Sequence, residues 1–104
     1  MSEFQPALPF ESLQEGFPTP VEINGVALAL YLLNGKPYCT DDLCSHEDNF
    51  LSAGGYVDGD EVECAFHGAR FDIKTGSPTQ SPASYPIRTF PVEVRDGQVY
   101  VAVD

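Results

Sequence analysis

The sequence predicts an all-β fold, a small antiparallel sandwich or barrel. Short hydrophobic segments alternate with turn dipeptides along the whole chain. Four of these dipeptides are Asn-Gly or Asp-Gly, at residues 24–25, 34–35, 58–59 and 96–97. Such dipeptides suit type I′ hairpins, in which both central residues have positive φ. No segment has the apolar periodicity of a long amphipathic helix.

The expected strands lie between these turns. They are Val21–Ile23, Val26–Leu33, Pro37–Thr40, Glu61–Cys64, Thr89–Arg95 and Gln98–Val103, with shorter strands at Phe4–Leu8 and Arg70–Ile73. A single helical turn is expected over Glu11–Glu15. The segment Ser77–Pro86 is expected to be a loop, and its prolines make it stiff enough to cover a neighbouring site.

Length and composition indicate one folded domain over residues 1–104. The chain is 42% hydrophobic and 12% aromatic, a composition typical of a folded protein and not of a disordered one. Its formal charge is −11, with only five Lys and Arg residues, so nucleic acid and anionic membrane surfaces would repel it. The acidic surface suits either basic patches on partner proteins or simple solvation.

The sequence predicts a cytoplasmic protein. The longest apolar run, Val26–Leu33, is too short to span a bilayer, and residues 1–4 lack the basic start of a signal peptide. Three cysteines are an odd number, which does not suit a secreted disulfide framework.

Two matched pairs of residues indicate a metal centre. Cys44 and His46 form a C-x-H pair, and Cys64 and His67 form a C-x-x-H pair. These pairs contain both histidines of the chain and two of its three cysteines. The remaining thiol, Cys39, has no histidine partner and is expected to be buried and structural.

The donor set allows two kinds of centre. Two Cys and two His can close a tetrahedral zinc site, although C-x-H is an unusually short zinc spacing. A 2Fe–2S cluster held by two thiolates and two imidazoles is the other solution. Both pairs follow expected strands, so the ligands would project on loops from a rigid sheet.

Residues 51–76, preceded by residues 42–46, resemble the Rieske 2Fe–2S proteins. Within them the chain is most similar to the ferredoxins that serve bacterial aromatic-ring-hydroxylating dioxygenases. The resemblance implies a Rieske-like β sandwich with one 2Fe–2S cluster held by two loops at one end. It implies that Cys44 and Cys64 bind one iron and that His46 and His67 bind the other, with no catalytic residue.

The resemblance also implies a low reduction potential. Respiratory Rieske proteins tie their ligand loops with a disulfide, whereas this chain has Asn49 and Phe66 at the corresponding places. Those proteins also place hydroxyl groups where this chain has Ala69 and Phe71. Because hydrogen bonds to sulfur stabilise the reduced cluster, we expect a potential near about −150 mV.

The function that this resemblance implies is one-electron transfer. The protein would take electrons from an NAD(P)H-dependent flavin reductase and pass them to a terminal oxygenase, as a monomer that docks transiently near His46 and His67. It lacks a nucleotide motif and the histidines of a 2-His-1-carboxylate iron site, so it is not expected to be an enzyme. Two alternatives are the small Rieske-like subunit of an assimilatory nitrite reductase and a zinc-stabilised interaction module without redox activity.

Overall fold

The computed structural model describes residues 3–44, 49–65, 68–81, 83 and 85–103. The molecule is elongated, with principal extents of 38 × 28 × 20 Å. Its elements are β1 (Phe4–Pro9), a 3₁₀ turn η1 (Phe10–Ser12), β2 (Thr19–Ile23), β3 (Val26–Leu33), β4 (Lys36–Asp41), β5 (Tyr56–Asp58), β6 (Glu61–Glu63), β7 (Arg70–Asp72), β8 (Pro78–Gln80), β9 (Thr89–Phe90), β10 (Val92–Arg95) and β11 (Gln98–Ala102). The predicted all-β class is confirmed.

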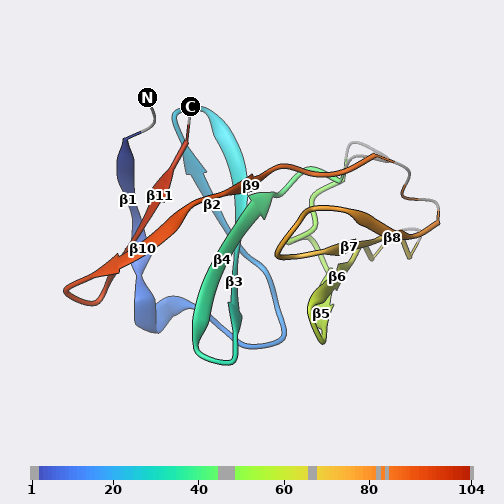
Figure 1. Cartoon of the computed structure of the whole chain (residues 1–104), viewed down its shortest axis with the longest axis horizontal. Helices are drawn as coiled ribbons and strands as arrows, with labels where there is room; N and C mark the ends of the chain where they lie inside the picture. Colours follow the sequence, from blue (N-terminus) through green and yellow to red (C-terminus); the bar gives the residue numbers. More distant parts are fainter. Residues whose placement is uncertain (1–2, 45–48, 66–67, 82, 84, 104) are drawn as a thin grey trace.

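The strands form three antiparallel sheets. Their strand orders are β1-β11-β10, β2-β3-β4-β9 and β5-β6-β7-β8. Figure 1 shows the first sheet at one end of the long axis and the third sheet at the other, with β2, β3 and β4 between them.

Three of the four predicted hairpin turns are confirmed. Asn24, Asn34 and Asp96 have positive φ, and so does the glycine that follows each of them. The fourth prediction was wrong by one residue. Asp58 pairs with Glu61, so the two turn residues are Gly59 and Asp60, and positive φ is found at Gly59. Glycine at the first central position is the pattern of a type II′ turn.

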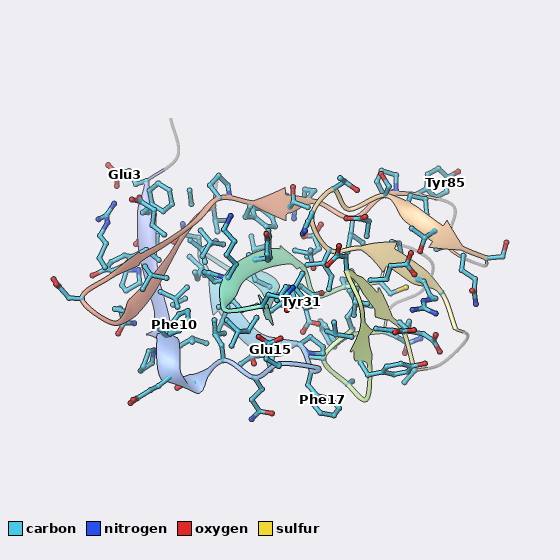
Figure 2. All side chains as sticks on the ribbon, turned by 60° about the horizontal axis from the view of Figure 1, so that its bottom comes forward. Glu3, Phe10, Glu15, Phe17, Tyr31 and Tyr85 are labelled. Atoms are coloured by element: carbon cyan, nitrogen blue, oxygen red, sulfur yellow. The ribbon has the colours of Figure 1, made fainter. Side chains whose placement is uncertain are left out.

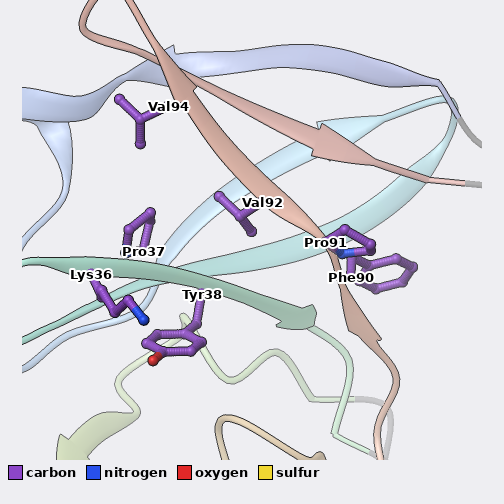
Figure 3. A pocket seen from close by; sticks show the side chains of 7 residues that line it. All are labelled: Lys36, Pro37, Tyr38, Phe90, Pro91, Val92 and Val94. Atoms are coloured by element: carbon purple, nitrogen blue, oxygen red, sulfur yellow. The ribbon is translucent and has the colours of Figure 1, made fainter.

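The expected strand Thr89–Arg95 is divided at Pro91. Phe90 pairs with Cys39 on β4, whereas Val92 pairs with Val101 on β11. Pro91 has no N–H for the ladder, and its carbonyl accepts a hydrogen bond from the Ala102 N–H at 3.1 Å. The chain thus crosses from one sheet to another, and a groove lies beside β4 where β9 passes into β10 (Figure 3).

Three further expectations need correction. The strands Tyr56–Asp58 and Pro78–Gln80 were not predicted, and the second lies inside the expected loop 77–86. The helical turn was expected at Glu11–Glu15 but is a 3₁₀ turn at Phe10–Ser12.

Strand β3 lies between two hydrophobic cores. Ala29, Tyr31 and Leu33 belong to the core beneath β5–β8, whereas Leu28 and Leu30 belong to the core beneath β1 and β11. Successive side chains of a strand point to opposite faces, so an uninterrupted hydrophobic strand fills both cores. Figure 2 shows Tyr31 at the centre of the molecule.

Candidate metal centre

Each of the two ligand loops is closed by the same hydrogen bond. The Cys44 N–H donates to the Asn49 carbonyl at 2.8 Å, and the Cys64 N–H donates to the Ala69 carbonyl, also at 2.8 Å. In both cases the donor precedes the acceptor by five residues. The two cysteines therefore occupy equivalent positions at the start of two similar loops.

Strand pairing fixes the base of each loop. Leu43 pairs with Phe50 below the first loop, and Glu63 pairs with Arg70 below the second. The predicted position of both pairs, on loops after β4 and β6, is thereby confirmed for the cysteines. His46 and His67 belong to these loops by sequence but lie outside the described residues.

Both cysteines are buried in one hydrophobic core. Cys44 and Cys64 are each 3% exposed, and they share this core with Leu51, Ala69 and Phe71. The two side chains that lack a hydroxyl, at positions 69 and 71, are fully buried there. Cys39 is also buried, as expected, but in the other core.

Two glycines bring the ligand loops together. A Cβ atom on Gly55 would lie 2.8 Å from the Glu63 carbonyl oxygen, and one on Gly54 would lie 3.3 Å from the Ala65 Cβ. The segment that follows the first loop thus packs directly against the start of the second. Only glycine at position 55 permits this approach, since that Cβ would also lie 2.1 Å from the Leu51 oxygen.

Residues 77–86, the third loop, are held beside the second ligand loop. At its base the Ile87 N–H donates to the Gly76 carbonyl at 2.9 Å. The Gln80 amide Nε2 donates to the Gly68 carbonyl at 3.3 Å, and Ala83 packs against the core that holds both cysteines. These contacts agree with the covering role expected for this loop, and Pro82, one of its prolines, lies outside the described residues.

The donor chemistry fits a centre shared by two loops. Within the described ranges no group of three or more His, Cys, Asp or Glu side chains is placed to hold a metal ion. What those ranges provide is one buried thiol from each loop. Buried thiols at equivalent loop positions suit a metal–sulfur centre, since the thiolate is the metal-binding form of cysteine.

Comparison with known proteins decides the family. The model of the Rieske [2Fe-2S] domain matches residues 3–91. The chain belongs to the Rieske [2Fe–2S] family. Its cofactor is therefore one Rieske-type 2Fe–2S cluster. Of the two centres that the donor set allows, the family thus favours the iron–sulfur cluster over the zinc site.

Individual relatives narrow the type of Rieske protein. The chain is 49% identical over 80 residues to the ferredoxin component of a p-cumate 2,3-dioxygenase system from Pseudomonas putida, covering 77% of this chain and 68% of that protein. It superposes on a Sphingomonas yanoikuyae B1 ferredoxin with a TM-score of 0.92 and 37% identity, covering 98% and 100% of the two chains. A structure of reduced oxygenase and oxidised ferredoxin in carbazole 1,9a-dioxygenase matches with a TM-score of 0.87 and 39% identity, covering 95% and 92%.

These relatives are electron-transfer components and not catalytic ones. The Rieske chain described here is accordingly an electron carrier rather than an enzyme. The part of it that the structure describes contains no helix long and apolar enough to cross a membrane.

The surface beside the first ligand loop is partly apolar. Leu43 and Phe50 are 42% and 45% exposed, and Tyr85 of the third loop is 70% exposed. Phe50 faces solvent, whereas its neighbour Leu51 is fully buried. Figure 2 shows Tyr85 toward one end of the long axis.

The acidic hairpin β5–β6 is organised by one arginine. Arg70 on β7 lies 2.8 Å from Asp58, 3.0 Å from Glu61 and 3.7 Å from Glu63. Its Nε contact with Glu61 is an ion pair without hydrogen-bond geometry. Hydrogen bonding to Asp58 is the main reason that the pKa of Arg70 is raised. The acidic side chains of the β5–β6 hairpin are therefore solvated in part and also joined by ion pairs to Arg70.

Two buried polar networks were missed by sequence reasoning. The Tyr31 hydroxyl lies 2.8 Å from the Thr40 Oγ1, which itself donates to the Asp41 carbonyl. Asp42 is 3% exposed, and its carboxylate accepts two hydrogen bonds from Ser52. No motif signals either network, because each joins residues nine or ten positions apart.

Proposed function

We propose that Cys44 and Cys64 bind one iron of the cluster and that His46 and His67 bind the other. The chain, as a single domain, carries one electron at a time from an NAD(P)H-oxidising flavoprotein reductase to a terminal oxygenase. The observation that carries this proposal is the pair of equivalent loops, each with one buried cysteine at its start.

The chemistry that a bound 2Fe–2S cluster supplies is the gain and loss of one electron. The chain's own residues hold the two thiols in place and keep water away from them. Leu51, Phe71 and Ile87 do so from within the core. Ala69 and Phe71 offer no hydroxyl to sulfur, which supports the proposed low potential near about −150 mV.

The partners are proposed from the relatives and from the surface. The carbazole 1,9a-dioxygenase structure contains a ferredoxin with its oxygenase. Exposed Leu43, Phe50 and Tyr85 offer apolar contacts near the ligand loops, and a charge of −11 suits basic partner surfaces. We propose a cytoplasmic monomer that makes small, transient contacts with these partners.

Spectroscopy of the purified protein tests the cofactor and the potential. We expect two irons per chain, a Rieske-type EPR signal on reduction, and a midpoint potential at the low end of the Rieske range. A colourless zinc protein would refute the proposal, and a clearly positive potential would refute the argument from the missing hydroxyls.

Reconstitution tests the electron path. With a flavoprotein reductase, NAD(P)H and a terminal oxygenase, product formation should require this chain. A Cys64→Ala variant is the matched control, because it should fold without a complete cluster. Equal turnover with and without the wild-type chain would contradict the proposed role.

A further inference from the structure

Asp42 is a buried carboxylate at the base of the first ligand loop. Among the described residues, Thr40 and Asp42 are the buried polar or charged ones, and Asp42 is 3% exposed. No ion pair found within the described ranges includes it. A buried charge without an opposite charge is costly, so its presence calls for a reason beyond packing.

Ser52 holds this carboxylate in one orientation. The Ser52 N–H donates to Oδ1 at 2.8 Å, and the Ser52 hydroxyl donates to Oδ2 at 2.5 Å. Both oxygens of Asp42 accept hydrogen bonds, which is the pattern of an ionised carboxylate. Hydrogen bonds to a charged acceptor are short and strong.

The backbone of Asp42 closes the base of the first ligand loop. The Leu51 N–H donates to the Asp42 carbonyl at 2.7 Å, and the Asp42 N–H donates to the Ala27 carbonyl at 3.1 Å. Asp42 is two residues before Cys44, so its backbone and side chain together tie the start of the loop to its end. Misplacing Asp42 would therefore displace a ligand.

Asp42 acts on Tyr31, a residue of the core that contains both ligand-loop cysteines. Burial raises the pKa of Tyr31 above its ordinary value, and the charge of Asp42 is among the further causes that raise it. Tyr31 lies in the core that contains Cys44 and Cys64. A negative charge in this low-dielectric region opposes the arrival of an electron nearby.

We propose that Asp42, clamped by Ser52, is a positioning residue of the first ligand loop whose fixed negative charge lowers the reduction potential of the cluster. This role rests on the proposed electron-carrier function. It makes Asp42 one of the residues that set the reduction potential, and so the driving force for electron transfer to the oxygenase.

The first test is Asp42→Asn compared with Asp96→Asn. Asparagine keeps the shape of Asp42, accepts from the Ser52 N–H and donates to the Ser52 hydroxyl, so mainly the charge is lost. Asp96 is exposed in the β10–β11 turn, at the opposite end of the molecule from β5–β8 (Figure 1). We expect an upward shift of the midpoint potential in D42N that exceeds the shift in D96N. Equal shifts in two variants with full clusters would overturn the inference.

Ser52→Ala gives a second test, in which the midpoint potential should shift in the opposite direction. This variant keeps the charge of Asp42 but removes the hydroxyl that partly neutralises it, so we expect a downward shift of the potential. A loop that is merely damaged would shift both variants in the same direction, and that outcome would overturn the inference. If D42N does not retain its cluster, the sign of the S52A shift decides alone.

Iron release measures the positioning role. We expect S52A, which loses the hydroxyl contact to Asp42, to lose iron to a chelator several-fold faster than D96N and than D42N, which keeps both contacts, and equal rates would overturn this part. Failure of these tests in variants with normal EPR signals leaves the electron-carrier function intact. A wild-type protein without a 2Fe–2S signal would instead refute that function itself.

Discussion

Cys39 and Cys64 are chemically identical and almost equally buried, yet they belong to different cores. Cys39 is 2% exposed and packs with Leu28, Leu30 and Val99, whereas Cys64 is 3% exposed and begins a ligand loop. The environment of each thiol, and not its burial, separates the structural residue from the proposed ligand.

Substitution by alanine should separate these two roles. We expect Cys39→Ala to lose about 1 kcal/mol of unfolding free energy, because one buried heavy atom is removed, and to keep two irons per chain. Cys64→Ala should lose the cluster. Iron analysis and denaturant unfolding measure both effects, and loss of iron in C39A would contradict the assignment.

Tyr31 and Cys39 should make the free energy of unfolding decrease as the pH rises through the alkaline range. Burial is the main cause that raises the pKa of each group above its ordinary value, 10.0 for the tyrosine and 9.0 for the thiol. In the unfolded chain both groups ionise near these ordinary values. Their contribution to stability is therefore fully present below about pH 9 and is lost progressively at higher pH.

Denaturant unfolding between pH 8 and 11 measures this dependence. Each group should contribute up to about 1.4 kcal/mol per pH unit to the alkaline decline. Y31F and C39A should each show a shallower decline, although Y31F also loses about 1 kcal/mol at every pH with its hydrogen bond to Thr40. An unchanged slope in the Y31F/C39A double variant would contradict this account.

At the level of elements, Gly35 and Gly76 can be compared directly because they share the same backbone conformation. Both have a φ of 80°, but a Cβ at Gly35 meets nothing within 4 Å, whereas one at Gly76 would lie 2.0 Å from the Ile87 carbonyl oxygen. Gly35 is therefore required for its backbone conformation alone. Gly76 is required for the closure of the third loop as well.

Alanine substitution should reveal this difference. We expect G35A to lose about 1 kcal/mol from the left-handed conformation, and G76A to lose at least about 2 kcal/mol because the close approach to Ile87 is also disrupted. Iron should leave G76A faster than G35A, since the third loop packs beside the second ligand loop. Unfolding free energies and chelator kinetics test this, and equal effects would contradict it.

The strands that the sequence predicted are those with strong local signals. Strand β3 is an apolar run bounded by two Asn-Gly turns, and its bounds were predicted correctly. β5 and β8 were missed because each has three residues and no buried one. Pairing with neighbours, which no local pattern encodes, makes them strands.

At the scale of the whole molecule, the site was predictable only in part. Spacing identified the four proposed ligands, and the equivalent loops around Cys44 and Cys64 agree with it. The clamp between Asp42 and Ser52 and the approach of Gly55 to Glu63 depend on tertiary packing. Neither has a local signature, because backbone and side-chain groups from different loops meet only in the folded chain.

The two cores predict how the molecule responds to removal of its cluster. One core contains Cys44 and Cys64 beneath β5–β8, and the other contains neither and lies beneath β1 and β11. A ligand that binds only the folded state stabilises the part that forms its site. Loss of the cluster should therefore loosen the first core much more than the second.

Hydrogen exchange of the holoprotein and of the chelated apoprotein tests this expectation. Amides in residues 56–73 should exchange at least tenfold faster after cluster removal, a loss of about 1.4 kcal/mol of local stability, while amides in residues 92–102 should change little. C64A should reproduce the apoprotein pattern without a chelator, and C39A should not. A uniform increase along the chain would show that the two cores unfold as one unit, and it would contradict the division of the molecule at β3.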